Sequence, residues 1–493
     1  MRASGILLPI ASLPSNYGIG CFSKQAYDFI DILIKAGQKY WQILPIGPTS
    51  FGDSPYQSFS TFAGNPYFID LEYLIQEGLL TKKECDSYDF GKNPTYIDYG
   101  KIYQSRFKLL NLAYKRSDCT NNKEYKEFCN KNAYWLEDYA LFMAVKDQFE
   151  GVSWNEWEKD IKLRIPSALE KYRNILSKEI NFYKYIQFEF TSQWVELKKY
   201  ANQNDVQIIG DIPIYVAFDS ADTWANPELF QFDENGIPIA VAGCPPDAFS
   251  STGQLWGNPL YRWEYHKEHN FDWWIQRIRY CLEQYDVLRV DHFKGFDEYY
   301  SIPFGDATAE NGTWKKGPGF DFFSELKNQL GEVNIIAEDL GNLTDSVRQL
   351  LKKTGYPGMK VLQFAFDSRE VSDYLPHNYE KNSIVYTGTH DNDTILGWYE
   401  SINKQDKELS KAYLNNYKSV KEEIPWDFIR LAQQSVSKLC IIPIQDYLGL
   451  DSKARINIPS TLGNNWVWRL KKEDITTDII KKMHQITKLY GRI

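Results

Sequence analysis

Four acidic residues follow short apolar runs of the sequence, and they are the first candidates for chemistry. They are Asp211, Asp291, Glu338 and Asp391, the last of which comes just after the run that ends at Thr387. These runs are rich in β-branched residues and are predicted as strands buried on both faces. Burying an ionised acid costs free energy unless a partner compensates its charge, so an acid at such a place is either paired or kept for a function. Taken singly, each acid could cap a helix or pair with an arginine, whereas four at one level of a fold favour chemistry.

Cleavage of a glycosidic bond is the chemistry that such acids could do together. One carboxyl must be ionised to attack the anomeric carbon, and another must be protonated to donate to the leaving oxygen. Arg289 lies two residues before Asp291, so both side chains should point to the same strand face, where the guanidinium favours the carboxylate. That arrangement fits a nucleophile, although a structural Arg-Asp pair would look the same in the sequence.

Eight short apolar runs supply the strands that would position these acids. They are Gly5–Ile10, Tyr40–Pro45, Val206–Asp211, Asp286–Asp291, Asn334–Glu338, Lys360–Phe364, Ser383–Thr387 and Leu439–Ile444. Helical patterns lie between several of them, at Phe22–Lys35, Phe271–Glu283 and Asp345–Lys353. This alternation predicts an α/β protein with a (β/α)8 TIM barrel, which gathers the carboxyl ends of its strands on one face, where active sites are built.

The spacing of the runs is uneven, which predicts insertions in one catalytic barrel that extends over residues 1–493. Residues 70–200 are rich in Lys, Glu, Tyr and Asn, and we expect them to form a largely helical insertion subdomain. Residues 217–270 are full of Pro, Gly and Trp, and we expect a second, loop-rich insertion there.

Composition limits the class of protein. The chain is 43% hydrophobic and 25% charged, as globular proteins are, and its formal charge of -9 argues against a broad nucleic-acid surface. Aromatic residues make up 16%, which suits sugar stacking but also simple core filling. The seven cysteines are scattered, and we expect neither a secretory signal nor a membrane helix. We expect a cytoplasmic enzyme with no metal, no nucleic acid and no membrane partner.

Six motifs occur in a fixed order along the chain. They are Gly52-Asp53-Ser54-Pro55-Tyr56-Gln57, Ala63-Gly64-Asn65-Pro66, Gly210-Asp211-Ile212-Pro213-Ile214-Tyr215-Val216, Arg289-Val290-Asp291-His292-Phe293, Ala337-Glu338-Asp339-Leu340-Gly341 and Gly388-Thr389-His390-Asp391-Asn392. In this order they resemble the 4-α-glucanotransferases known as amylomaltases or disproportionating enzymes, glycoside hydrolase family 77 of the α-amylase clan. The resemblance extends over essentially the full length. One motif would be a weak signal, whereas six in order are specific.

The resemblance implies retaining transfer of α-1,4-glucan segments between maltooligosaccharides, in starch, glycogen or maltodextrin metabolism, with no cofactor. It implies that Asp291 is the nucleophile, that Glu338 is the general acid and then the base, and that Asp391 helps to distort the sugar ring. It also implies a set of substrate-binding residues: Ser54, Tyr56, Asp211, Gln254, Trp256, Arg289, His390 and Asn457.

Residues 245–259 are similar to the loop that covers the cleft in this family. A lid there would keep water away while an acceptor sugar attacks the intermediate, although an ordinary surface loop is the alternative. The sequence also departs from the family's pattern. Phe51 stands where some relatives have a tyrosine proposed to bind glucan at a remote groove, and Lys294 replaces a frequent arginine. Phe51 can stack on a sugar but cannot donate a hydrogen bond, which puts that second site in question.

Two other interpretations stay open at this point. One is an α-glucan hydrolase of the same clan, which the products formed from maltotriose would distinguish from a transferase. The other is a non-catalytic barrel that binds glucan or serves as a scaffold. The presence of Asp291, Glu338 and Asp391 together argues against the second, because a module freed from catalysis need not keep all three.

Overall fold

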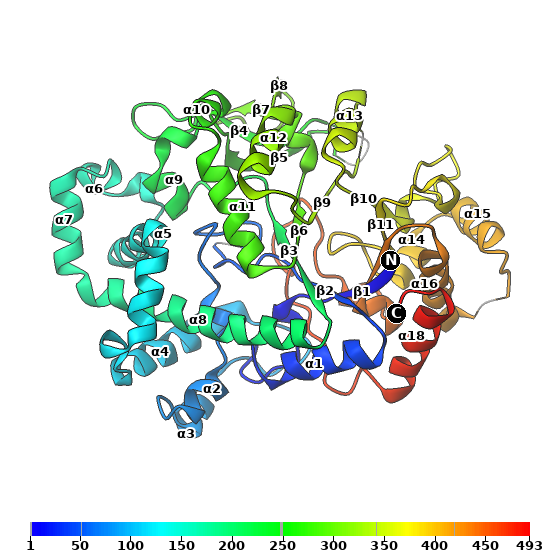
Figure 1. Cartoon of the computed structure of the whole chain (residues 1–493), viewed down its shortest axis with the longest axis horizontal. Coiled ribbons are helices and arrows are strands. Elements are labelled where there is room, and N and C mark those ends of the chain that lie inside the picture. Colours follow the sequence, from blue (N-terminus) through cyan, green and yellow to red (C-terminus); the bar gives the residue numbers. More distant parts are fainter. Residues whose placement is uncertain (1, 51, 247–249, 342, 419) are drawn as a thin grey trace.

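A parallel barrel forms the centre of the molecule (Figure 1). The computed structural model describes residues 2–50, 52–246, 250–341, 343–418 and 420–493. Within them, the barrel strands are β1 (Ala3–Leu7), β2 (Tyr40–Gln42), β3 (Gln207–Ile212), β6 (Val287–Val290), β9 (Ile335–Ala337), β10 (Gly358–Val361), β11 (Ser383–Tyr386) and β12 (Leu439–Pro443). Each predicted run corresponds to one of these strands, so the predicted (β/α)8 barrel is confirmed.

The strand order is β10-β11-β12-β1-β2-β3-β6-β9, and all neighbours in it are parallel. The two ends of this order meet, because the main-chain N–H of Ala337 in β9 donates to the carbonyl of Pro357, 3.0 Å away, just before β10. The register places Asp211 of β3 directly opposite Arg289 of β6. Functional side chains from distant parts of the sequence are thereby brought to one level.

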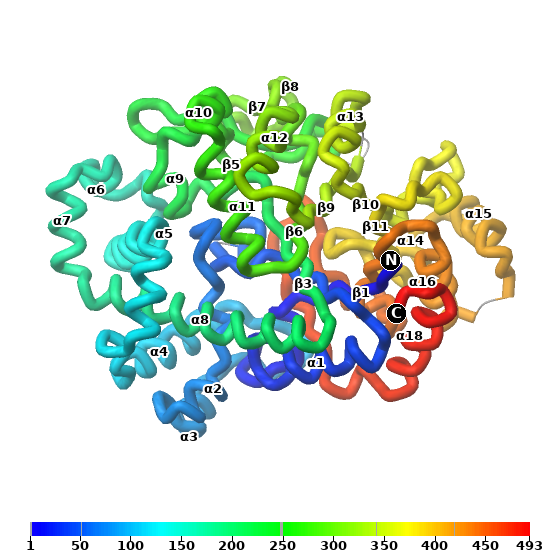
Figure 2. The backbone as a smooth tube through the Cα atoms, viewed as in Figure 1, coloured from blue at the N-terminus to red at the C-terminus, as the bar shows by residue number. Residues whose placement is uncertain are grey.

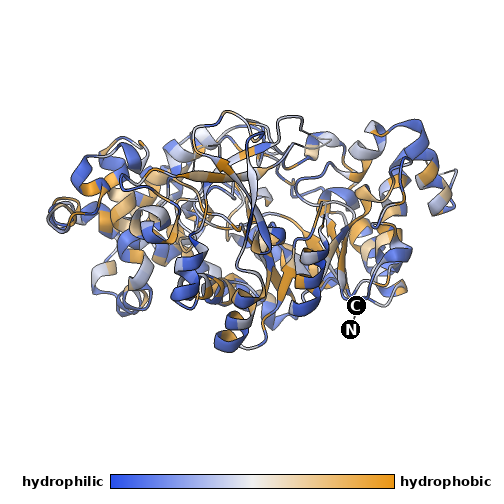
Figure 3. Cartoon of the chain, turned by 90° about the horizontal axis from the view of Figure 1, so that it is seen from above, coloured by the Kyte–Doolittle hydropathy of each residue, from blue (hydrophilic) through white to orange (hydrophobic). Residues whose placement is uncertain are grey.

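Both faces of the strands are buried, which explains their near-continuous apolar sequences. One face contributes to a separate apolar cluster that includes Leu7, Ile209, Ile336, Val361 and Ile441. The alternate residues pack against the surrounding helices in the main core. Figure 3 shows the hydrophobic residues gathered in the strands and on the inner faces of the helices. Among the described residues, no helix combines the length and the apolar character needed to cross a membrane.

Helices follow the strands on the outside of the barrel. They include α1 (Lys24–Lys35), α11 (Asp272–Gln284), α12 (Gly319–Leu330), α13 (Asp345–Thr354), α14 (Ile395–Ser401), α15 (Lys404–Leu414), α16 (Ile424–Gln434), α17 (Ile444–Tyr447) and α18 (Thr477–Leu489). The helical patterns predicted from the sequence correspond to α1, α11 and α13, with ends that differ by at most two residues. On α1, the side chains of Ala26, Phe29, Ile30 and Leu33 form the buried stripe.

The long connection from β2 to β3 is helical. Its helices are α2 (Leu71–Gln76), α3 (Lys82–Asp86), α4 (Tyr99–Arg116), α5 (Lys123–Gln148), α6 (Lys159–Lys162), α7 (Pro166–Ile175) and α8 (Ser177–Gln203). Figure 2 shows this part of the chain, blue to cyan-green, beside the barrel, with α8 running back toward β3. Most of residues 70–200 are thus in helices, and the insertion subdomain stays a prediction.

The second predicted insertion, residues 217–270, is more regular than a loop. It contains α9 (Ala221–Ala225), β4 (Ala240–Cys244), β5 (Gln254–Pro259) and α10 (Trp263–Glu268). The strands β4 and β5 join β7 (Glu298–Pro303) and β8 (Thr313–Lys316) in an antiparallel sheet of order β5-β4-β7-β8. The sequence analysis missed this sheet because β7 lies beyond β6 and because the register shifts between Val241 and Gly243.

Candidate active site

A cleft of about 640 Å³ opens at the carboxyl ends of the barrel strands. Most of the predicted site residues line it: Ser54, Tyr56, Gln254, Trp256, Asp291, His390, Asp391 and Asn457. The other three contact this lining directly. Asp211 accepts a hydrogen bond from Tyr56, Arg289 pairs with Asp291, and Glu338 accepts one from the main chain of His292. The structure therefore brings all of the predicted residues together.

A buried ion cluster connects β3 with the end of β6. Nη1 of Arg289 lies 2.7 Å from both carboxylate oxygens of Asp211 and 3.0 Å from Oδ1 of Asp291. Burial alone would lower the pKa of Arg289, but the two carboxylates outweigh it and raise that pKa well above its usual value. Arg289 is therefore a fixed positive charge, and it shares a strand face with Asp291, as predicted.

Tyr56 joins this cluster to an aromatic wall. Its hydroxyl donates to Oδ2 of Asp211 over 2.8 Å, and its ring is stacked on that of His390 at 5.1 Å between centroids. Burial and then the charge of Asp211 raise the pKa of Tyr56, so the phenol keeps its proton and acts as the donor. Oγ of Ser54 accepts the main-chain N–H of Tyr56 at 3.2 Å and fixes this turn.

Glu338, just after β9, is the acid whose environment favours a proton. Its carboxyl accepts the main-chain N–H groups of His292 at 2.7 Å and of Leu340 at 2.9 Å. Burial and then the nearby charge of Asp291 raise the pKa of Glu338 to about 7, although Arg289 and the two N–H donors oppose the shift. Near neutral pH this carboxyl can both hold and release a proton.

Asp391, in the loop after β11, is held in the opposite state. Burial would raise the pKa of Asp391, but His390 and Asn457 outweigh it and hold that pKa far below its ordinary value. Nε2 of His390 lies 3.3 Å from Oδ2 of Asp391, and Nδ2 of Asn457 donates to Oδ1 over 2.6 Å. At neutral pH Asp391 is therefore ionised, whereas Glu338 still holds a proton in part of the molecules.

Two residues of the predicted lid lie on β5. Nε1 of Trp256 donates to the side-chain oxygen of Gln254 at 3.1 Å, and the Trp256 ring lies edge-on to that of His292 at 5.0 Å. Both residues line the cleft. The part of the predicted lid at Asp247–Phe249, and Phe51 of the predicted remote site, lie outside the described residues.

His292 and Trp466 line the cleft, although the sequence analysis assigned them no role. Their backbones have left-handed φ values of 47° and 64°, which are uncommon for residues with large side chains. The Trp466 ring lies 5.8 Å from that of Tyr56 and 6.0 Å from that of His390. The position of His292 next to Asp291 could have indicated that it belongs to the site. No local sequence pattern indicates the same for Trp466.

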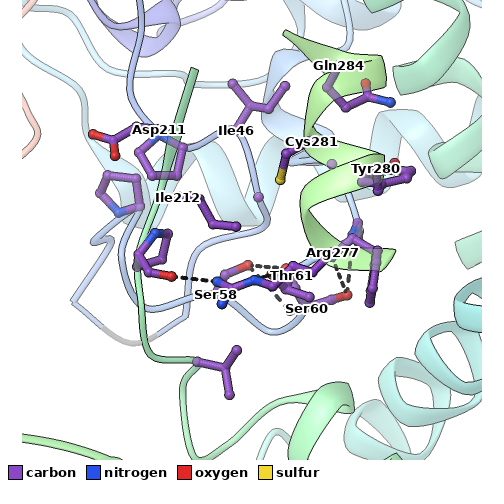
Figure 4. Close-up of a pocket in the computed structure, with 18 of the residues that line it drawn as sticks. Ile46, Ser58, Ser60, Thr61, Asp211, Ile212, Arg277, Tyr280, Cys281 and Gln284 are labelled. Carbon is purple, nitrogen blue, oxygen red and sulfur yellow. Dashed lines mark hydrogen bonds between the residues drawn. The ribbon is translucent and has the colours of Figure 1, made fainter. Parts of the chain in front are cut away.

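A much smaller cavity, about 60 Å³, lies between β3 and α11 (Figure 4), and Tyr56 and Asp211 are among the residues that line it. Arg277 of α11 lines it and donates to Oγ1 of Thr61 at 2.5 Å and to the carbonyl of Pro213 at 2.6 Å. Arg277 thereby ties the segment after Tyr56 to the segment after β3. With a volume of about 60 Å³, this cavity is far smaller than the cleft of about 640 Å³.

The acids of this site differ in protonation, since Asp391 is ionised and Glu338 can hold a proton. Among the described residues, no group of three or more His, Cys, Asp or Glu side chains is arranged to hold a metal ion. A parallel barrel that carries an ionised carboxylate and a carboxyl able to hold a proton at its strand ends, beside an aromatic-lined cleft, defines the class of barrel enzymes that act on glycosidic bonds.

Comparisons with known proteins make the assignment more specific. Residues 8–476 match the family model of glycoside hydrolase family 77, described as 4-alpha-glucanotransferase. The chain belongs to this family, and it is an enzyme of the 4-alpha-glucanotransferase class.

The similarity to individual relatives extends over whole chains. A 4-alpha-glucanotransferase from Clostridium butyricum is 50% identical over 98% of this chain and 99% of its own length. A 4-alpha-glucanotransferase from Streptococcus pneumoniae TIGR4 is 48% identical over 100% of this chain and 98% of its own length. Among solved structures, the amylomaltase from Streptococcus agalactiae in complex with acarbose has a TM-score of 0.97 and 43% identity, with both chains covered completely.

Proposed function

We propose that this enzyme transfers α-1,4-glucan segments from one maltooligosaccharide to another, with retention of the anomeric configuration. The observation that carries the proposal is the pair formed by Asp291 and Glu338. Arg289 stands beside Asp291 at 3.0 Å, while burial and the charge of Asp291 raise the pKa of Glu338 to about 7. One carboxyl suited to attack and one suited to donate a proton are what retaining glycoside chemistry requires.

In the first step, a carboxylate oxygen of Asp291 attacks the anomeric carbon and forms a covalent glycosyl-enzyme. The glycosidic C–O bond breaks, and Glu338 donates its proton to the leaving oxygen. The fragment on the reducing-end side of the cut then leaves. In the second step, the 4-hydroxyl of an acceptor glucan attacks the same carbon, the ionised Glu338 takes its proton, and Asp291 is released.

The remaining site residues hold the sugar ring next to Asp291. Asp391 binds its hydroxyls as an anion and favours distortion toward an oxocarbenium shape. Tyr56 supplies a ring face, backed by His390, and the Arg289-Asp211 pair and Asn457 fix the groups around it. Ser54 holds the turn that carries Tyr56. No cofactor takes part in these steps.

Transfer, as opposed to hydrolysis, requires that an acceptor sugar and not water reaches the intermediate. Gln254 and Trp256 line the cleft. They belong to residues 245–259 of the second insertion, residues 217–270, and this segment acts as the lid beside the acceptor sugar. Residues 70–200 form a helical subdomain on the single catalytic barrel, residues 1–493. Donors and acceptors are α-1,4-glucans, consistent with the binding of acarbose by the relative from Streptococcus agalactiae.

The test is the product pattern from maltotriose, read by chromatography. A ladder of longer chains that forms together with glucose and maltose supports transfer. Glucose and maltose without elongation would instead identify the clan's hydrolytic reaction. Incubation of Glu338→Gln with α-maltotriosyl fluoride, followed by mass spectrometry of the peptide that contains Asp291, tests the covalent step. A glycosylated Asp291 is expected, and attachment to another residue would refute the nucleophile assignment.

A further inference from the structure

The barrel is closed between β9 and β10 partly by a side chain. The main-chain N–H of Ala337 donates to the carbonyl of Pro357 at 3.0 Å. Two residues after Pro357, in β10, the main-chain N–H of Met359 donates to Oδ1 of Asp339 at 2.6 Å. In a regular parallel pair this N–H would find a main-chain carbonyl of the neighbouring strand. At this seam, a carboxylate takes the place of that carbonyl.

Glu338 lies between the two attachments of the seam. Ala337, the residue before it, and Asp339, the residue after it, are both bonded to the β10 segment. On its other side, the main-chain N–H of Glu338 donates to the carbonyl of Val290, and its own carbonyl accepts the N–H of Phe293, both at 3.0 Å. The backbone that carries this carboxyl is therefore held from two neighbouring strands.

The position of the Asp339 carboxylate also requires that no side chain stands opposite it. A Cβ placed on Gly358 would lie 2.3 Å from Oδ2 of Asp339, closer than real atoms approach. Gly358 is thus the residue that leaves room for this carboxylate at the start of β10. Asp339 is buried, 8% exposed, so its place at the seam is enclosed by protein.

We propose that Asp339 is a positioning residue for Glu338. By closing the seam just beyond the acid, its carboxylate fixes the direction in which Glu338 meets the leaving oxygen of the glucan. The inference rests on the proposed function, in which Glu338 donates that proton. A general acid must lie within hydrogen-bond reach of the atom that it protonates, so a displacement of about 1 Å would slow the reaction by roughly 100-fold.

Three variants distinguish the effect of the hydrogen bond between Met359 and Asp339 from the effect of the charge of Asp339 and from the effect of replacing Asp339 at all. Asp339→Ala removes the acceptor and leaves the N–H of Met359 without its partner. Asp339→Asn keeps an oxygen acceptor at the same place. Gly358→Ala displaces the carboxylate by steric contact while Asp339 and Glu338 remain. Gly100→Ala in α4 is the matched control, since its added Cβ would meet the nearest atom at an ordinary 3.6 Å.

Two donor reactions report whether the acid is misplaced. With maltotriose the leaving oxygen needs a proton. With α-maltotriosyl fluoride as donor and azide as acceptor, fluoride leaves as an anion and azide attacks without loss of a proton, so neither step needs Glu338. We expect Asp339→Ala and Gly358→Ala to lose roughly 100-fold in kcat on maltotriose, with KM almost unchanged. On the fluoride and azide pair, we expect them to lose less than about fivefold.

Asp339→Asn and Gly100→Ala are expected to resemble the unaltered enzyme on both donors. Equal losses on the two donors, or full activity of Asp339→Ala on maltotriose, would overturn the inference. Glu338→Gln serves as the reference: if fluoride and azide fail to spare it as well, the proposed role of Glu338 is wrong. If they spare Glu338→Gln but not the seam variants, the inference on Asp339 alone fails. Circular dichroism verifies folding, and Gly358→Ala decides the question if Asp339→Ala does not fold.

Discussion

The main-chain N–H of His292 donates a hydrogen bond to Oε2 of Glu338, 2.7 Å away. His292 directly follows Asp291, so the residue next to one carboxyl of the site holds the other. The relative position of the two acids thus depends on the main chain at the ends of β6 and β9 more than on flexible side chains. This arrangement suits chemistry in which both carboxyls must act on one glycosidic bond.

Replacement of Asp291 by asparagine is expected to abolish turnover but not folding. The amide cannot form the glycosyl ester, so kcat on maltotriose should fall on the order of 10⁴-fold or more. Arg289 keeps its paired contacts with Asp211, so the melting temperature should change little. Binding of acarbose, measured by calorimetry, should persist. Asp478→Asn on the surface of α18 is the control, and substantial activity of the Asp291 variant would contradict its role as nucleophile.

Glutamine at position 338 is expected to alter the pH profile. In the proposed mechanism Glu338 acts as the acid while it is protonated, and its pKa of about 7 means that this form is lost as the pH rises through neutrality. The unaltered enzyme should therefore show a falling basic limb near pH 7. The Glu338→Gln variant should lose roughly 10²- to 10⁴-fold in kcat and that limb together. A basic limb that remains at the same pH would assign it to another group.

Loss of the Tyr56 hydroxyl should weaken the reaction less than loss of the whole ring. In Tyr56→Phe, Asp211 loses one donor at 2.8 Å but keeps Arg289, and the ring can still stack on His390. We expect a loss of about 1.4 kcal/mol, or roughly tenfold in kcat/KM. Tyr56→Ala should also raise KM, because the ring face is gone. Equal kinetics for the two variants would remove the ring from substrate binding.

Removal of the indole at position 256 should shift the enzyme from transfer toward hydrolysis. Trp256 lines the cleft and covers one edge of His292, so Trp256→Ala opens that side to water. The share of donor cleavages that end in free sugar, measured from glucose release and chain elongation, should rise several-fold. Ile239→Ala near the start of β4 is an exposed control. An unchanged share would show that water is excluded by other residues.

The buried acid Glu189 on α8 should make the protein less stable as the pH rises. Burial and then the charge of Glu77 raise the pKa of Glu189 to about 7, whereas the unfolded chain ionises near 4.5. Folding thus carries no penalty from this group below pH 4.5, and the full penalty above pH 7. That penalty is at most about 3 kcal/mol. Urea unfolding at several pH values should show a flatter profile for Glu189→Gln, and parallel profiles would contradict the assignment.

The barrel could be predicted because strands buried on both faces have continuous apolar sequences. The ends of strands were less accurate. Lys360–Phe364 was predicted where β10 is Gly358–Val361, since Gly358 resembles a turn residue locally. Its presence in a strand is explained by the close approach of Asp339, a contact across the seam that no local pattern reveals.

The charged residues of the site could be predicted from the sequence, but the residues and the sheet that surround them could not. Strand alternation alone indicated that Arg289 and Asp291 share a face. In contrast, no local sequence pattern indicates the left-handed backbones of His292 and Trp466, because residues other than glycine seldom adopt that conformation. The antiparallel sheet of β4 and β7 was missed for a related reason, since its strands are separated by a barrel strand in the sequence.

The distance along the chain between β2 and β3 also determines the order in which the enzyme folds. These neighbours pair in parallel through Tyr40 and Gln207, and helices α2 to α8 lie between them in sequence. Closing so long a loop costs entropy before any contact repays it, so local helices form first and the barrel closes late. During refolding, the helical circular dichroism signal should recover before activity on maltotriose, which requires the closed barrel.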